Sequence, residues 1–262
     1  MQKPLEIIRE QGAEAAAAAA GEALNQLLAD NAEKPVLLLL SAGSALGLLD
    51  YVSAKSIGEH LTVAMLDERF STDEKINNFE QLQKTDFYAV AFGAEANFFG
   101  SLPRIIPQGA VRGTPRIIPQ GAIRGVPRPG ETMDGLAQRM EKNLRTWKTE
   151  NPRGKIIATF GMGSDGHTAG IFPFADKKKF DKLFSSDNWM VAYDAGDKHQ
   201  YHLRVTATLT FIKLVDIGIA CVCGPDKKDK LNELISGKPA VNELPAAAWH
   251  EIKNVKIFTD LK

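Results

Sequence analysis

The stretch KPVLLLLSAGS, residues 34–44, holds an unbroken apolar run that stops at a turn of small residues. A short apolar run of this kind is typical of a parallel strand that is buried on both faces of its sheet. The serines, alanine and glycine that follow allow a tight turn where the strand ends. We therefore predict a buried parallel strand over residues 36–40.

The same scheme recurs along the chain. Apolar strands followed by polar or glycine residues are predicted in LTVAMLDERF (61–70) and GKIIATFGMG (154–163), and further strands over 189–195, 201–209, 216–224 and 255–260. Helices are predicted over 5–31, which contains six consecutive alanines, and over 45–54, 77–86, 131–151 and 225–237. Strands that alternate with helices predict an α/β fold: a single domain, residues 1–262, with a mainly parallel, Rossmann-like sheet flanked by helices.

The composition excludes several classes of protein. The 262 residues are 44% hydrophobic and 24% charged, which is ordinary for a globular protein with a core. The 32 basic residues balance 32 acidic residues, whereas a nucleic-acid-binding domain normally carries a positive excess. No apolar run approaches the roughly 20 residues that span a bilayer, and the N-terminus lacks a secretory signal. We expect a cytoplasmic protein that binds neither nucleic acid nor membrane, and the sequence leaves its oligomeric state open.

The two cysteines, Cys221 and Cys223, lie two residues apart in a predicted strand and point to the same face. A redox or metal pair is one interpretation, but two ligands do not complete a zinc site. Small, buried apolar residues are the interpretation that the sequence favours. Because no other ligand cluster is evident, no metal site and no cofactor are expected.

A tandem duplication interrupts the alternating pattern. PRIIPQGAVRGT (103–114) is followed directly by PRIIPQGAIRGV (115–126). Proline and glycine are too dense here for a helix or a central strand, so we predict an inserted surface loop over 103–126. Its four arginines form either a basic patch or a solvated, tolerated insertion, and the second interpretation is favoured.

Three polar segments follow predicted strands: SAGS (41–44), LDER (66–69) and GMGSDGHTAG (161–170). Ligands of parallel α/β sheets bind beyond the carboxyl ends of the strands, so these segments should meet at one edge of the sheet. The backbone N–H groups of SAGS suit an anion such as phosphate. In the glycine-rich turn, Asp165 stands beside His167, and a carboxylate that orients a histidine suits proton transfer near neutral pH.

These segments also carry a resemblance to a known family. GMGSDGHTAGIFP (161–173) is similar to the signature GMGxDGHTASLFP of the 6-phosphogluconolactonases. LDERF and INNFE resemble the DER motif of that family and its following Ser-Asn-aromatic segment. LRVTATLTFI, VCGPDKKDKL and ELPAAAW resemble further motifs in the same order, from about residue 36 to the end. The related glucosamine-6-phosphate deaminases usually continue GxDGHIAFNEP, and HTAGIFP lacks that Asn-Glu.

The resemblance implies hydrolysis of a phosphorylated sugar lactone, 6-phosphogluconolactone, to 6-phosphogluconate in the oxidative pentose phosphate pathway. It implies His167 as the base that activates water and Asp165 as the residue that orients it. The substrate-binding residues expected from the matching motifs are Ser41, Gly43, Ser44, Asp67, Arg69, Asn78, Gly163, Gly166, Arg204 and Lys227.

Two alternatives stay open at this point: a glucosamine-6-phosphate deaminase or isomerase, and a non-catalytic protein that binds a sugar phosphate. The first loop supports the second of these, because SAGSAL replaces the usual Ser-Gly-Gly-Ser-Thr-Pro and loses a threonine hydroxyl. Gly170 also stands where the family usually has serine.

Overall fold

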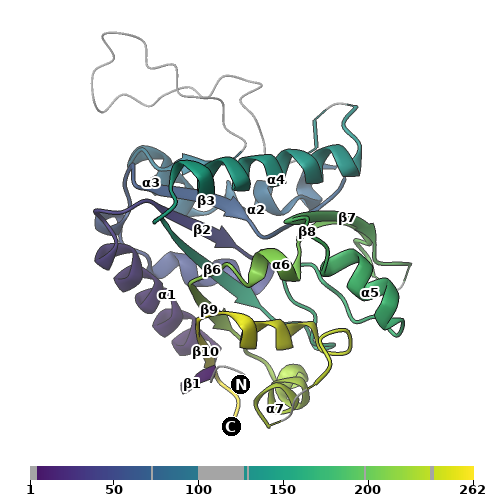
Figure 1. The fold of residues 1–262 in the computed structure, drawn as a ribbon. Coiled ribbons are helices and arrows are strands. Elements are labelled where there is room, and N and C mark those ends of the chain that lie inside the picture. The colour runs from purple at the N-terminus through teal and green to yellow at the C-terminus, as the bar shows by residue number, and fades with distance from the viewer. Residues whose placement is uncertain (1–4, 72, 100–126, 129, 198, 237–238) are drawn as a thin grey trace.

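A seven-stranded parallel sheet forms the centre of the computed structural model, which describes residues 5–71, 73–99, 127–128, 130–197, 199–236 and 239–262 (Figure 1). Its strands lie in the order β1-β10-β9-β6-β2-β3-β5. Their bounds are β1 Leu5–Arg9, β2 Val36–Leu40, β3 Leu61–Met65, β5 Asn97–Phe98, β6 Lys155–Gly161, β9 Ile217–Cys221 and β10 Asn254–Thr259. The predicted duplication loop, 103–126, lies outside the described residues.

Helices cover both faces of this sheet (Figure 1). They are α1 Ala13–Asp30, α2 Asn78–Leu82, α3 Asp86–Gly93, α4 Met133–Glu150, α5 Lys177–Phe184, α6 Leu209–Ile212 and α7 Lys228–Ser236. Short 3-10 helices add η1 Gly43–Tyr51, η2 Ala54–Ser56, η3 Glu74–Ile76, η4 Pro225–Lys227 and η5 Pro245–Glu251. None of the helices in the described ranges is long and apolar enough to cross a membrane.

Strand β2 shows why the fold is layered. All five of its residues are buried, as the sequence predicted. Leu37 and Leu39 belong to the core cluster that includes Leu144 of α4, whereas Leu38 and Leu40 belong to the cluster that includes Leu24 of α1. Because side chains alternate along a strand, an unbroken apolar run supplies both cores at once.

The predicted helix over residues 5–31 was wrong at its start. Residues Leu5–Arg9 form β1, which pairs in parallel with β10 in the register Leu5↔Val255. Gly12, with φ 104°, separates this strand from α1. Local composition favours a helix here, but pairing with the distant β10 provides backbone hydrogen bonds and apolar contacts that sequence periodicity does not reveal.

A second sheet of three antiparallel strands, in the order β4-β8-β7, adds to the predicted parallel sheet. Its strands are β4 Asp67–Arg69, β8 Leu203–Ala207 and β7 Met190–Asp194. Leu66 links the two sheets, because its N–H donates to Leu40 O at 2.9 Å and its carbonyl accepts from Ala207 N, also at 2.9 Å. The polar segment after β3 is therefore a strand, and its backbone pairs with β8.

Candidate active site

The glycine-rich segment after β6 folds into a tight turn that fixes a histidine. The N–H of Gly163 donates to His167 O at 2.9 Å, and the N–H of Gly166 donates to Gly163 O at 3.0 Å. His167 Nδ1 lies 2.6 Å from Asp165 Oδ1, and the same oxygen accepts the backbone N–H of His167 at 3.0 Å. One carboxylate oxygen thus holds both the ring and the backbone of His167.

In this pair the carboxyl of Asp165 is ionised, and both side chains are accessible to solvent. Burial disfavours the carboxylate of Asp165, but the hydrogen bonds and charge interaction with His167 outweigh it and hold the pKa of Asp165 below its usual value. The side chains of His167 and Asp165 are 37% and 42% exposed. With Asp165 ionised, Nδ1 is the ring atom that carries hydrogen, which leaves the lone pair on Nε2 for a proton from solvent or substrate.

Two glycines of the turn leave no space for a side chain. A Cβ at Gly163 would overlap the imidazole of His167, and a Cβ at Gly166 would overlap Leu244. Gly166 also has φ 84°, in the region that favours glycine. These glycines shape the turn that presents His167, and their predicted contact with substrate stays a prediction.

After this turn the chain folds back, so that the ring of Phe172 packs against the imidazole of His167. Thr168 and Ile171 form an isolated antiparallel bridge, and the ring centroid of Phe172 lies 4.5 Å from that of His167. The guanidinium of Arg204, from β8, lies 5.3 Å from the centroid of Phe172. Phe172 therefore connects the turn after β6 with the second sheet.

Arg204 is a buried cation with one carboxylate partner. Its Nη1 lies 3.3 Å from Asp67 Oδ2, and their side chains are only 9% and 8% exposed. Asn78 Nδ2 donates to the carbonyl oxygen of Asp67 at 3.0 Å and to its Oδ2 at 3.1 Å. Three predicted site residues thus form one hydrogen-bonded group. Gly170 packs on it, since a Cβ there would lie 2.8 Å from the Cβ of Asp67.

The buried side chain of Glu68 stabilises the backbone around Asp67 and Asn78. Its carboxyl accepts the backbone N–H groups of Arg69 at 2.7 Å, Asn78 at 2.5 Å and Phe79 at 3.0 Å, so it joins β4 to the start of α2. Complete burial raises the pKa of Glu68 to about 8, although these three donors act in the opposite direction.

Arg69 is half-buried and lies opposite Arg204 in the β4–β8 register. Its guanidinium lies 4.6 Å from the centroid of the Tyr201 ring, and its Nη1 donates to Ile76 O at 3.4 Å. Burial and then the charge of Arg204 lower the pKa of Arg69. Two guanidinium groups therefore lie near each other, and the carboxylate of Asp67 offsets the charge of Arg204.

The first loop is placed beside the same turn. Ser41 is buried, its N–H donates to Thr159 Oγ1 of β6 at 3.3 Å, and its Oγ has no hydrogen-bond partner among the described residues. Gly43, with φ 71°, begins η1. Ser44 follows in η1, and its side chain lies outside the described part of the structure. A Cβ at Gly161 would lie 3.7 Å from the Cβ of Ala45, so this loop adjoins the start of the turn that holds His167.

Lys227 occupies η4, in the turn that follows β9. It is half-buried, and its N–H donates to Gly224 O at 3.1 Å. Since β9 pairs with β6 in the register Cys221↔Gly161, this turn and the turn of His167 leave the sheet at the same edge. Over the described ranges, no hydrogen bond or ion pair joins Lys227 to His167.

Comparison with known proteins places this arrangement in a family. A family profile described as glucosamine-6-phosphate isomerases/6-phosphogluconolactonase matches residues 8–258. The chain belongs to this family.

Individual members of the isomerase/lactonase family share less of the sequence. A 6-phosphogluconolactonase from Xylella fastidiosa (strain 9a5c) is 28% identical over 133 residues, which are 50% of this chain and 52% of that relative. The match therefore spans about half the length of the curated relative.

Solved structures of the family share the fold. A 6-phosphogluconolactonase from Shewanella baltica OS155 superposes with a TM-score of 0.69 at 18% identity, covering 98% of this chain and 97% of that chain. A monomeric glucosamine-6-phosphate deaminase superposes with a TM-score of 0.68 at 13% identity, covering 97% of each chain. Both enzyme types of the family thus have this architecture.

Three residues at the candidate site were not predicted from the sequence. Phe172, Glu68 and Tyr201 contact predicted site residues but were not themselves predicted. Glu68 had one signal, because a carboxylate in the middle of a strand after a buried run needs partners. Tyr201 had none, since its contact with Arg69 depends on the pairing of β8 with β4.

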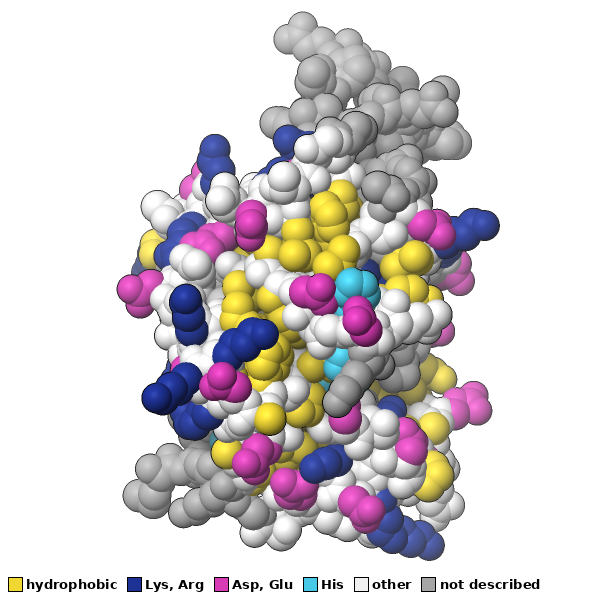
Figure 2. All heavy atoms as spheres, turned by 90° about the vertical axis from the view of Figure 1, so that its right-hand side faces the viewer, with side chains coloured by type: hydrophobic (Ala, Val, Ile, Leu, Met, Phe, Trp, Pro, Cys, Tyr) yellow, Lys and Arg dark blue, Asp and Glu magenta, His cyan; other side chains and the backbone are white. Residues whose placement is uncertain are grey.

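The face of the molecule drawn in Figure 2 combines apolar and acidic side chains. Figure 2 shows histidine side chains next to acidic ones, bordered by hydrophobic side chains. Within the described ranges, His202 also pairs with an aspartate, because its Nδ1 lies 2.7 Å from Asp194 Oδ1. Among the described residues, no group of three or more His, Cys, Asp or Glu side chains could hold a metal ion.

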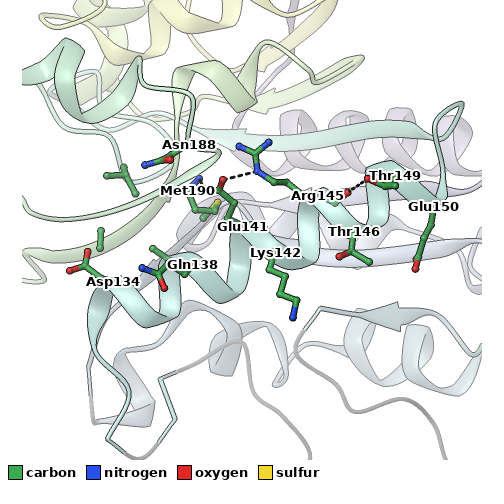
Figure 3. Close-up of a pocket in the computed structure, with 13 residues that line it drawn as sticks. Asp134, Gln138, Glu141, Lys142, Arg145, Thr146, Thr149, Glu150, Asn188 and Met190 are labelled. Atoms are coloured by element: carbon green, nitrogen blue, oxygen red, sulfur yellow. Dashed lines mark hydrogen bonds and ion pairs between the residues drawn. The ribbon is translucent and has the colours of Figure 1, made fainter.

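A separate cavity of about 710 Å³ lies between α4 and β7, away from the turn of His167 (Figure 3). Its central polar groups already have partners: Glu141 pairs with Arg145 Nε at 2.7 Å and accepts the N–H groups of Trp189 at 3.0 Å and Met190 at 3.2 Å. Arg145 also lies 4.5 Å from the centroid of the Trp189 ring. These contacts fasten α4 to the second sheet, and they assign no chemistry to this cavity.

Proposed function

We propose that this protein hydrolyses 6-phosphogluconolactone to 6-phosphogluconate, with His167 as the general base. The observation that carries the proposal is the 2.6 Å contact between His167 Nδ1 and Asp165 Oδ1 in a solvent-accessible turn at the carboxyl edge of the parallel sheet. The curated relative named as a 6-phosphogluconolactonase supports the choice of substrate.

The reaction needs one proton acceptor and later one proton donor. His167 Nε2 takes a proton from water as the water oxygen bonds to the lactone carbonyl carbon. When the intermediate collapses, the bond between that carbon and the ring oxygen breaks, and His167 returns the proton to the ring oxygen. Asp165 stabilises the imidazolium that exists between the two steps, because its charge faces Nδ1.

The cations divide between binding and positioning. Arg204 is neutralised by Asp67 and lies over Phe172, so we assign it mainly to positioning Phe172 beside His167. Arg69 and Lys227 are partly accessible, and no ion pair within the described ranges neutralises either. We assign these two to the anionic oxygens of the substrate, where arginine can bind phosphate through two N–H groups and lysine acts as a compact charge. We assign Gly43 to close approach of the backbone to the substrate, and Gly163 and Gly166 to shaping the turn that presents His167.

A glucosamine-6-phosphate deaminase is the second candidate, because the solved deaminase superposes almost as well as the lactonase. Fold likeness at such identities does not separate the two activities. The sequence HTAGIFP, which lacks the deaminase Asn-Glu, favours the lactonase.

The test measures lactone hydrolysis above the spontaneous rate, and ammonia release from glucosamine 6-phosphate in parallel. In a lactonase, His167→Asn should lower kcat by about 10²–10⁴-fold, the usual contribution of general acid–base catalysis. His202→Asn is the matched control, because it removes the histidine of the other histidine–aspartate pair, and it should leave kcat unchanged. Wild-type turnover in a folded His167→Asn protein would contradict the mechanism, and ammonia release without lactone hydrolysis would contradict the substrate.

A further inference from the structure

Two thiols lie together at the end of β9. Cys221 is the last residue of the strand and is buried, whereas Cys223 is half-buried. Both are free, and their Sγ atoms are 3.8 Å apart. They are the only cysteines of the sequence, so each has the other as its sole potential disulfide partner within the chain.

We propose that Cys221 and Cys223 are a redox modification site, which a hydroperoxide converts into a reversible intramolecular disulfide that displaces the Lys227 turn. The regulatory part of this proposal rests on the anion-binding role assigned to Lys227 above. The formation of the disulfide does not depend on that role.

Cys223 is the thiol that reacts first. A hydrogen bond from the Cys221 thiol lowers the pKa of Cys223. The backbone N–H of Asp260 and the charge of Lys227 act in the same direction, whereas partial burial and the charge of the Asp260 carboxylate oppose them. The same hydrogen bond and burial raise the pKa of Cys221. Cys223 therefore loses its proton more readily, and its partial exposure lets a small peroxide reach the sulfur.

The chemistry balances in two steps. The Cys223 thiolate attacks one peroxide oxygen, the O–O bond breaks, and a sulfenic acid forms while hydroxide, or alkoxide from an organic peroxide, leaves. The Cys221 thiol then attacks the sulfenic sulfur, the new S–S bond forms, and the sulfenic oxygen leaves as water. The two cysteines lose two electrons in total, and the peroxide gains them.

Closing the bond must move Cys223 rather than Cys221. Cys221 is held on both sides, opposite Gly161 of β6 and Phe258 of β10. A disulfide requires the sulfur atoms to approach from 3.8 Å to about 2.05 Å, and the part of this approach that side-chain rotation does not supply must come from contraction of the chain after Cys221.

That contraction reaches the Lys227 turn directly. Gly224 follows Cys223 with φ 102°, and its N–H donates to Asp260 Oδ1 at 3.1 Å. Its carbonyl accepts the N–H of Lys227 at 3.1 Å. Since Cys223 directly precedes Gly224, the first residue of this hydrogen-bonded turn, we infer that oxidation displaces Lys227 and weakens anion binding at the site.

The experiment treats the full-length protein with hydrogen peroxide and measures intact mass, free thiols and lactone kinetics before and after dithiothreitol. We expect the monomer to lose two hydrogens and both reactive thiols. The KM for the phosphorylated lactone should rise roughly tenfold, the lower end of the cost of losing a hydrogen bond to a charged group, and dithiothreitol should restore it.

Two variants provide the controls. Cys223→Ser should abolish both the mass change and the KM change, while Cys221→Ala should leave Cys223 as a sulfenic acid that dimedone captures. A wild-type protein that keeps two free thiols under peroxide, or forms only disulfide-linked dimers, would overturn the modification site. Disulfide formation with an unchanged KM would overturn its link to Lys227. If the reduced protein hydrolysed no lactone, the proposed function would fail, while the mass measurement would still decide whether the disulfide forms.

Discussion

Gly163 lies so close to the imidazole of His167 that any side chain at this position would occupy the same space. The acid and the histidine of the turn supply its chemistry, but the glycine decides where the imidazole can lie. At the residue scale, the position of the His167 ring therefore depends on the absence of a Cβ at residue 163.

Gly163→Ala tests this point. The added methyl should push the imidazole away from Asp165, lowering kcat by at least tenfold, because displacement of a catalytic group by about 1 Å is costly. Gly47→Ala is the matched control, since a Cβ at Gly47 meets nothing within 4 Å, and it should keep the wild-type rate. Circular dichroism should show both variants folded, and full activity of Gly163→Ala would mean that the observed contact does not constrain the histidine.

At the scale of elements, Glu68 links β4 to α2 and gives a pH-dependent stability. The pKa of Glu68 is about 8 in the folded protein against a usual value of 4.5, so between these values the folded state keeps a proton that the unfolded state has lost. The free energy of unfolding should therefore fall as pH rises through this window.

Two substitutions separate the proton from the hydrogen bonds. Glu68→Gln cannot titrate, so its free energy of unfolding, measured with urea from pH 5 to about 8, should lack this decline. Glu68→Ala leaves buried N–H groups without their acceptor and should cost about 1–3 kcal/mol. Glu14→Gln, at an exposed carboxylate in α1, should keep the wild-type pH profile. Parallel profiles for wild type and Glu68→Gln would contradict the raised pKa.

The elements that the sequence predicted well are those whose burial is visible in their own residues, as an unbroken apolar run. The runs of β2 and β6 are apolar because both of their faces are covered, and this signal needs no knowledge of partners. The sequence predicts a helix at β1 because these five residues show no alternation of apolar and polar side chains and precede an alanine-rich helix. β7 and β8 were predicted as strands, but their antiparallel pairing in a second sheet is a property of long-range contacts.

At the scale of the whole molecule, the candidate site joins the two sheets. His167 and Asp165 follow β6 of the parallel sheet, whereas Arg69 and Arg204 belong to the antiparallel sheet. The sequence predicted these four residues because each lies in a short motif: LDER, GMGSDGHTAG or LRVTATLTFI. The contacts of Phe172 and Tyr201 left no such pattern. Phe172 meets Arg204 only when the second sheet packs against the turn, and Tyr201 meets Arg69 only when β8 pairs with β4.

The duplication at 103–126 provides the last prediction. The elements on either side are anchored independently of it: β5 pairs with β3 at Thr62↔Asn97, and Leu136 and Leu144 of α4 are buried in the core. Deleting residues 115–126 shortens the connection between them by less than half. Because loop closure changes by roughly 0.6 kcal/mol for each doubling of length, we expect a change in unfolding free energy no larger than this.

The same deletion decides what the arginines of the duplication do. If they are only solvated, a protein without the second copy should keep both its melting temperature and its kcat/KM for the lactone. A control that keeps the length but replaces Arg116 and Arg124 with glutamine separates charge from chain length. Loss of kcat/KM in both variants at an unchanged melting temperature would show that the basic residues attract the anionic substrate, an effect that should weaken with salt. A large fall in melting temperature after deletion alone would show instead that the second copy packs against the core.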